Sequence, residues 1–225
     1  MEPSQLLLIV ILIAANLVVS MLGFRAFRGP AGIGEAGASG AASVGALMDP
    51  DTYLFIPHRV ARGEKLPGVV VSNLSHAGWL HLVFNMFALF SFAGGVLGAL
   101  GSLSFILIYV IAGIGCNLVV YALRKNDPAY RCLGASGSVF GIVTAAVVLD
   151  PTISIAFLFV PIPIPGPVFM LAYVLISLYL ISRNVRDGIS HEGHLGGALA
   201  GFVVTGLISP AGYQPLIQWI ARSVG

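Results

Sequence analysis

Residues 80–123 read LHLVFNMFALFSFAGGVL, then GALGS, then LSFILIYVIAGIGCNLVVYAL, so two apolar runs flank a short Gly-containing segment. About 20 apolar residues are needed to cross the ~30 Å hydrocarbon core of a membrane as a helix. The runs 80–97 and 103–123 have about that length. They predict two membrane-spanning helices joined by a turn at 98–102.

The composition of the whole chain supports a membrane location. Of its 225 residues, 57% are hydrophobic and 9% are charged, and the mean hydropathy is +0.96. Soluble domains carry roughly 25% charged residues, so this chain has too little polar surface to cover itself in water. The net charge of +2 is too small to predict a nucleic-acid partner. The length suits a single domain, residues 1–225.

Four further apolar segments complete a predicted fold of six transmembrane helices in an all-α, polytopic membrane protein. Residues 5–24 follow Glu2 with no preceding Lys or Arg, which favours a true span over a cleaved secretory signal. Residues 152–167 are apolar but contain four prolines, so we expect a buried loop there. The four additional helices are expected at 5–24, 136–149, 168–182 and 193–208.

The connection 25–78 is long and mixed in composition. Its stretch 29–45 is rich in Gly, Ala and Ser and is predicted to be mobile. The part from Tyr53 to Ser75 alternates charged, Pro and β-branched residues, and we expect it to fold against the membrane surface. Cys116 and Cys132, the two cysteines, are expected to be separate thiols.

Polar residues lie near the starts of the second, fourth and sixth predicted helices. They are His81 and Asn85, Ser136, and His194. Strongly polar groups inside membrane spans are energetically expensive, so each is a functional hypothesis by default. In a six-helix chain the even-numbered helices all start on one side of the membrane. These side chains are therefore predicted to meet at one depth.

Glycines four residues apart follow the serine and the histidine. Such small-xxx-small faces let membrane helices approach closely. A close approach is what a serine hydroxyl needs to reach a histidine nitrogen at about 2.6–3.2 Å. The two pairs are Gly137 with Gly141, and Gly197 with Gly201.

The chemistry that this arrangement predicts is acyl transfer. Ser136 is the nucleophile, and His194 is the base that takes its proton near neutral pH. His81, Asn85 and the backbone N–H at Ser136 are the candidate donors for the oxyanion, each worth about 3–4 kcal/mol. The spans contain no Asp or Glu, so the catalytic group is predicted to be a dyad.

Three motifs together resemble the rhomboid intramembrane proteases, over about residues 66–208. They are HAGWLHLVFNM at 76–86, GASG at 134–137 and GHLGGALAG at 193–201. The resemblance implies that Ser136 and His194 are the catalytic dyad and that His81 and Asn85 help form the oxyanion hole. It also places Phe140 against the catalytic histidine. Support and helix packing are expected from Gly134, Gly137, Gly141, Gly197 and Gly201.

The resemblance further implies cleavage of single-pass membrane proteins within or next to their transmembrane segments, without a cofactor or metal. It implies a multi-pass protein of the cell (inner) membrane, with an organelle membrane as the open alternative. Two positions depart from the family's pattern. Pro67-Gly68 stands where a Trp-Arg pair is common, and Leu97 stands where a glutamate is common. Both positions support the first loop and not the chemistry.

Three rival functions stay open. The first is an inactive rhomboid-like protein that binds client membrane proteins. The second is a metalloprotease or metal transporter, suggested by the run His191–His194, although its histidines are three apart where a zinc-protease helix has them four apart. The third is a channel or a small-solute transporter. His58, His76 and His191 are expected to be loop or interface residues.

The side of the membrane on which the first loop lies can be predicted and tested. Ten of the eleven Lys and Arg residues fall in the connections after helices one, three and five. The positive-inside rule would therefore turn the active-site mouth toward the cytoplasm, whereas six-helix bacterial rhomboids usually open outward. The first loop holds five of the ten, and long loops translocate regardless of charge. We therefore predict that a topology reporter inserted within 30–45 lies outside the cytosol, and a cytosolic signal would contradict this orientation.

Overall fold

The computed structural model describes residues 2–28, 49–157 and 160–224, so the predicted mobile stretch 29–45 lies outside the described residues. The described part is helical apart from one pair of short strands. The elements in chain order are α1 (Pro3–Arg28), η2 (Pro50–Tyr53), α3 (Pro57–Val60), α4 (Gly68–Val71), η3 (Ser72–Leu74), α5 (Trp79–Arg124), α6 (Ser136–Leu149), β1 (Ser154–Phe157), β2 (Val160–Pro165), α7 (Gly166–Ser182), α8 (His191–Ile208), η4 (Pro210–Tyr213) and α9 (Gln214–Val224).

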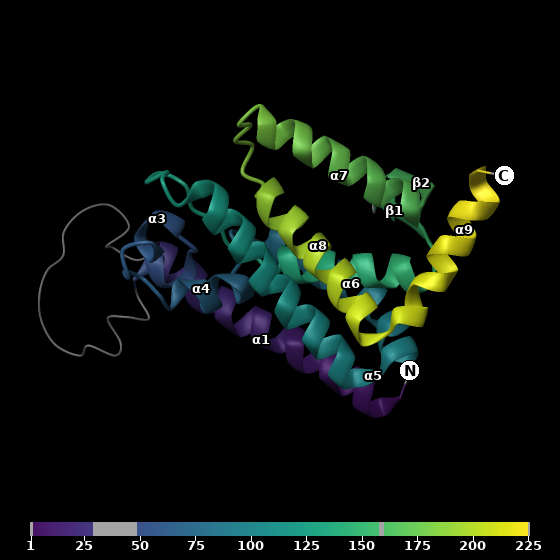
Figure 1. Cartoon of the computed structure of the whole chain (residues 1–225). Helices are drawn as coiled ribbons and strands as arrows, with labels where there is room; N and C mark the ends of the chain where they lie inside the picture. The colour runs from purple at the N-terminus through teal and green to yellow at the C-terminus, as the bar shows by residue number, and fades with distance from the viewer. Residues whose placement is uncertain (1, 29–48, 158–159, 225) are drawn as a thin grey trace, which may run out of the picture.

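The centre of the bundle is formed by α5, α6 and α8, which pack extensively on one another. Helix α1 lies along α5, and α7 lies on the outer side of α8 (Figure 1). Among the described residues, two helices, α1 and α5, are long and apolar enough to cross a membrane, and α6 and α7 are shorter apolar helices. From Gly137 to Val148, every α6 side chain except Phe140 is buried. This arrangement fits an all-α membrane bundle.

The predicted turn at 98–102 is reduced to one residue. The helix α5 runs from Trp79 to Arg124 with a single break at Gly101, where φ is +77°. Only glycine adopts such a φ without strain. A 46-residue helix would be about 69 Å long, roughly twice the membrane core. The break therefore decides whether α5 crosses once or turns back.

Contacts with α1 indicate that the chain turns back at Gly101. Near the start of α1, Gln5 donates to the Leu97 carbonyl at 3.1 Å. Near its end, Ser20 donates to the Leu74 carbonyl at 3.2 Å. The first half of α5 is therefore antiparallel to α1. After the break the direction is reversed, because Asn16, in the middle of α1, donates to the Tyr109 hydroxyl at 3.3 Å.

The prediction of a buried loop at 152–167 is wrong. Within this segment the strands β1 and β2 pair antiparallel, with Ile155 opposite Ile164, and Ile162 is 66% exposed. Residues two apart in a strand direct their N–H groups to the same side. Pro163 and Pro165 therefore both place their missing N–H on the outer edge, and β2 keeps its bonds to β1. Prolines are tolerated on such an edge.

The C-terminal helix α9 was not predicted. It spans Gln214–Val224 and contains Pro215, Gln218 and Arg222 among its apolar residues. A membrane span is recognised in sequence by a continuous apolar run, and this short amphipathic segment is not one. Helix α9 follows α8 through the turn η4 and lies at the margin of the bundle (Figure 1).

Glycines bring the backbones of α6 and α8 into direct contact. A Cβ atom on Gly197 would collide with the Gly137 carbonyl, and one on Gly201 would lie 2.5 Å from the Gly141 Cα atom. On its other side, a Cβ on Gly141 would collide with the Ala112 side chain of α5. Helix α6 is therefore held between two neighbours that leave no room for side chains at these positions.

This packing predicts that Gly201→Ala destabilises the protein. The added methyl group meets α6 backbone, which has no rotamer with which to yield, and overpacking of this kind costs about 1–3 kcal/mol. Gly95→Ala is the matched control, because a Cβ there meets nothing within 4 Å. That exposed helical site should be neutral or stabilised by about 0.5–1 kcal/mol. Thermal unfolding in detergent measures both, and equal midpoints for the two variants would contradict the packing argument.

Candidate active site

Ser136 and His194 meet at the N-terminal ends of α6 and α8. The His194 Nε2 atom lies 2.6 Å from the Ser136 Oγ atom. Ser136 is the first residue of α6, and His194 is in the first turn of α8. The distance is within the range that lets a histidine take a serine proton. The structure thus brings together the two residues that the sequence analysis selected as nucleophile and base.

Gly134 lies inside the site and away from the helix contacts. Its φ of +135° is strained for any residue with a side chain. A Cβ at this position would lie 2.8 Å from His81 Cε1, 2.9 Å from His81 Nε2 and 3.5 Å from Ser136 Oγ. The Gly134 N–H donates to the Ser72 carbonyl at 2.9 Å. The backbone before the serine therefore runs close to the His81 ring because no side chain intervenes.

Two aromatic residues surround the ring of His194. Phe140 stacks on it with ring centroids 4.6 Å apart and an interplanar angle of 20°. Tyr173, from α7, packs on Phe140 at 4.4 Å, and its hydroxyl lies 2.7 Å from His194 Nδ1. Sequence analysis missed Tyr173. Its polar hydroxyl within the apolar helix 168–182 was the available signal.

The two predicted oxyanion residues lie on one face of α5. The His81 ring lies beside Gly134. Asn85 is buried one turn later, where its side-chain amide donates to the His81 carbonyl at 3.0 Å. That bond uses one of the two amide hydrogens of Asn85. The first N–H groups of α6 have no partner within the helix, so they are candidate backbone donors.

His76 lies at the site although it was expected to be a loop or interface residue. Its side chain is fully buried. The Nδ1 atom lies 2.9 Å from the Ser20 hydroxyl of α1, and the Ala135 N–H donates to Nε2 at 3.5 Å. The ring also meets His81 edge-on at 4.9 Å. His76 therefore joins α1 to the residue that precedes Ser136.

The described part of the first loop, 49–78, holds the segment that precedes Ser136. Phe55 and Cys132 form an antiparallel bridge with N–H···O distances of 2.8 and 3.1 Å. From α5, the Asn117 amide donates to the Val69 carbonyl at 2.6 Å. Burial raises the pKa of the Cys132 thiol, so Cys132 stays a neutral thiol at pH 7 and is a poor nucleophile.

The loop itself is folded by ion pairs and by one tight backbone approach. Arg59 pairs with Asp51, and Lys65 pairs with Asp49. Gly68, at the position where the family commonly has Trp-Arg, has no room for a Cβ because the Leu54 carbonyl occupies that space. This chain therefore has a close backbone contact at Gly68, and ion pairs elsewhere in the same loop.

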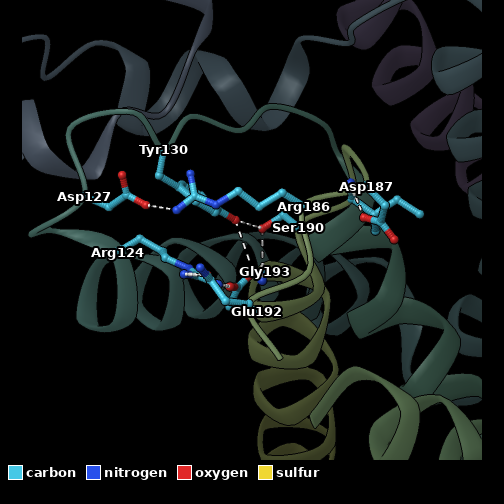
Figure 2. A network of polar contacts seen from close by, with 10 residues as sticks. Arg124, Asp127, Tyr130, Arg186, Asp187, Ser190, Glu192 and Gly193 are labelled. Atoms are coloured by element: carbon cyan, nitrogen blue, oxygen red, sulfur yellow. Dashed lines mark hydrogen bonds and ion pairs between the residues drawn. The ribbon is translucent and has the colours of Figure 1, made fainter. Parts of the chain in front are cut away.

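The start of α8 is anchored by a buried polar network (Figure 2). The Ser190 hydroxyl accepts from the Gly193 N–H at 3.2 Å and lies 2.8 Å from the Tyr130 hydroxyl. Arg124, at the end of α5, forms an ion pair with Glu192, whose side chain is 4% exposed. Tyr130 also donates to Glu192 at 3.2 Å. Burial raises the pKa of Tyr130, so its hydroxyl keeps the proton that it donates.

A second pair of contacts holds the connection between α7 and α8. Arg186 donates to Asp127 at 2.5 Å, and His191 Nε2 lies 3.1 Å from Asp187. The Ile189 N–H and His191 lower the pKa of Asp187. His191 is thus turned toward Asp187 while His194 is turned toward Ser136. Within the described ranges, no three His, Cys, Asp or Glu side chains gather where they could hold a metal ion.

Comparison with known proteins identifies the family of this chain. Residues 63–211 match the Rhomboid domain, and this range contains residues placed at the site from α5 to α8, namely His81, Asn85, Ser136, Tyr173 and His194. The chain belongs to the rhomboid family. It is 29% identical over 140 residues to the mitochondrial presenilin-associated rhomboid-like protein of Mus musculus, covering 59% of this chain and 36% of that protein.

Two further relatives come from a bacterium and a plant. The "Putative rhomboid protease YdcA" of Bacillus subtilis is 39% identical over 83 residues, 37% of this chain and 40% of the relative. The chloroplastic rhomboid-like protein 11 of Arabidopsis thaliana is 28% identical over 167 residues, 68% of this chain and 56% of the relative. The matched region spans about a third of the length of the mitochondrial relatives.

The network at the start of α8 predicts that Glu192→Gln destabilises this rhomboid. The substitution keeps the shape of the side chain but removes the charge that Arg124 faces, and hydrogen bonds to charged groups contribute about 1.5–3 kcal/mol. Glu64→Gln is the matched control, because Glu64 pairs with Arg62 at an exposed site, where such pairs contribute about 0–1 kcal/mol. Thermal unfolding in detergent compares them. An equal midpoint for Glu192→Gln and the wild type would show that the network is dispensable.

Proposed function

We propose that this protein is an intramembrane serine endopeptidase that hydrolyses peptide bonds in or next to transmembrane segments of other membrane proteins. The observation that carries the proposal is the 2.6 Å contact between Ser136 Oγ and His194 Nε2. A serine that served only helix packing would bond to a carbonyl one turn back. Ser136 instead faces a histidine from another helix.

The reaction proceeds in two halves. The Ser136 oxygen attacks the carbonyl carbon of the substrate while its proton passes to His194 Nε2. The tetrahedral intermediate collapses, the C–N bond breaks, and His194 returns the proton to the departing amine. Water then attacks the acyl-enzyme with His194 as base again. The second half frees the carboxyl product and restores Ser136. This chemistry uses side chains of the protein and needs no cofactor.

Charge develops on the substrate's carbonyl oxygen in both halves. His81, next to Gly134, supports the proposal as a donor, and so do the N–H groups at the start of α6. Asn85 has a second amide hydrogen beyond the one on the His81 carbonyl. A small cavity of about 10 Å³ beside Ser136 and His194, lined in part by Ser72, Asn73 and Asn117, has about the size needed for one water molecule.

We further propose that the bundle crosses the membrane six times. The spans are α1, the two halves of α5 separated at Gly101, α6, α7 and α8. The partners are then the lipid bilayer and single-pass membrane protein substrates. The proposed location is the cell (inner) membrane or an organelle membrane, and the relatives named as mitochondrial and chloroplastic support the second.

The test compares the wild type with Ser136→Ala and His194→Ala in detergent and in lipid vesicles, against a panel of transmembrane substrates. We expect wild-type cleavage and a fall in kcat of roughly 10⁴-fold or more in each variant, because the nucleophile and its base act as a unit. Thermal unfolding controls for folding. Variants that cut as fast as the wild type would refute the proposal.

If no substrate in the panel is cleaved, a covalent probe distinguishes an unsuitable panel from an inactive protein. A fluorophosphonate reacts with an activated serine independently of substrate sequence, so the wild type should be labelled and Ser136→Ala should not. An unlabelled but folded wild type would favour the client-binding alternative, in which the family fold holds membrane proteins without cutting them.

A further inference from the structure

Both ring nitrogens of His194 have partners from different helices. Nε2 lies 2.6 Å from Ser136 Oγ of α6, and Nδ1 lies 2.7 Å from the Tyr173 hydroxyl of α7. A neutral imidazole carries one proton, so one of its nitrogens donates and the other accepts. Which nitrogen holds that proton decides whether His194 can act as a base toward Ser136.

The chemistry requires that Nε2 be the acceptor. If Nε2 takes the serine proton, the proton of the neutral ring is on Nδ1, and Nδ1–H donates to the Tyr173 oxygen. We infer that Tyr173 is a positioning residue that holds His194 in this tautomer and fixes the direction of its ring. This inference rests on the proposed function, and it adds a third member to the predicted dyad.

The surroundings of His194 leave this role to Tyr173. In the part of the chain that the structure describes, the side-chain hydrogen bonds of His194 go to Ser136 and Tyr173. Phe140 packs against both rings, at 4.6 Å from His194 and 4.4 Å from Tyr173. An acidic third member would be costly inside the bundle, whereas a tyrosine hydroxyl oxygen accepts a hydrogen bond from Nδ1–H without adding a charge.

The partner comes from α7, a helix outside the central three. Helix α7 packs on α8 and α6 less extensively than α5, α6 and α8 pack on one another. The orientation of His194 therefore depends on where α7 lies against α8. The Tyr173 ring, seated on Phe140, is the link between them.

Tyr173→Phe removes the hydroxyl and keeps the ring on Phe140. In metal sites, removing the hydrogen-bond partner of a ligating histidine's second nitrogen typically lowers metal affinity or activity 10- to 100-fold. We expect a fall of roughly that size in the rate of fluorophosphonate labelling and in kcat, with KM nearly unchanged. Tyr179→Phe is the matched control. It makes the same change on the same helix, at a side chain that is 59% exposed, and should leave both values at wild-type level.

The tautomer is measured directly by ¹⁵N NMR of the imidazole nitrogens, with the His194 signals assigned by their loss in His194→Ala. We expect the Nδ1–H form in the wild type and in Tyr179→Phe, and a gain of the Nε2–H form in Tyr173→Phe. This measurement needs no activity. If the wild type fails to react with the probe, the proposed function falls, while the tautomer still decides the role of Tyr173. An identical His194 tautomer in wild type and Tyr173→Phe would overturn the inference, as would an unchanged labelling rate.

Discussion

The contact between the backbones of α6 and α8 is the constraint on which the site depends. Gly197 meets the Gly137 carbonyl, and Gly201 meets Gly141. Ser136 directly precedes the first contact on α6, and His194 is three residues before it on α8. A side chain of ordinary size at these glycines would separate the helices by several ångströms. The 2.6 Å contact between the serine and the histidine would then be lost. The glycine packing inside the bundle therefore sets the distance between Ser136 and His194 at its end.

Around this contact, the polar side chains at the active-site end of the helices are partnered across elements. His194 bonds to α6 and α7, His76 bonds to α1, and Glu192 pairs with Arg124 of α5. In a low dielectric such bonds are strong, and losing a partner is costly. The network that begins at Glu192 has a second effect, because it anchors α8 two residues before the proposed base.

The connections outside the apolar helices complete the site. The segment before Ser136 is bridged to Phe55 and Ser72 of the first loop, and it includes Gly134, whose φ of +135° admits no ordinary side chain. Family membership agrees with this construction, since the matched range 63–211 begins within that loop and ends after α8. Much of the length of the mitochondrial relatives lies outside the matched region. Substrate choice in this chain therefore depends on the residues of its own site.

The sequence by itself determined the membrane class, the places of the long apolar helices and the candidates Ser136, His194, His81 and Asn85. These follow from local properties, because hydropathy, glycine spacing and the cost of a polar group in a span are readable along the chain. Only the tertiary structure decided that Tyr173 and His76 join the site, that Gly101 alone reverses α5 and that residues 154–157 and 160–165 pair as strands. Tyr173 and His76 resemble ordinary aromatic and loop residues in sequence. Their partners are 21 and 56 residues away, and such pairings exist only once the helices have packed.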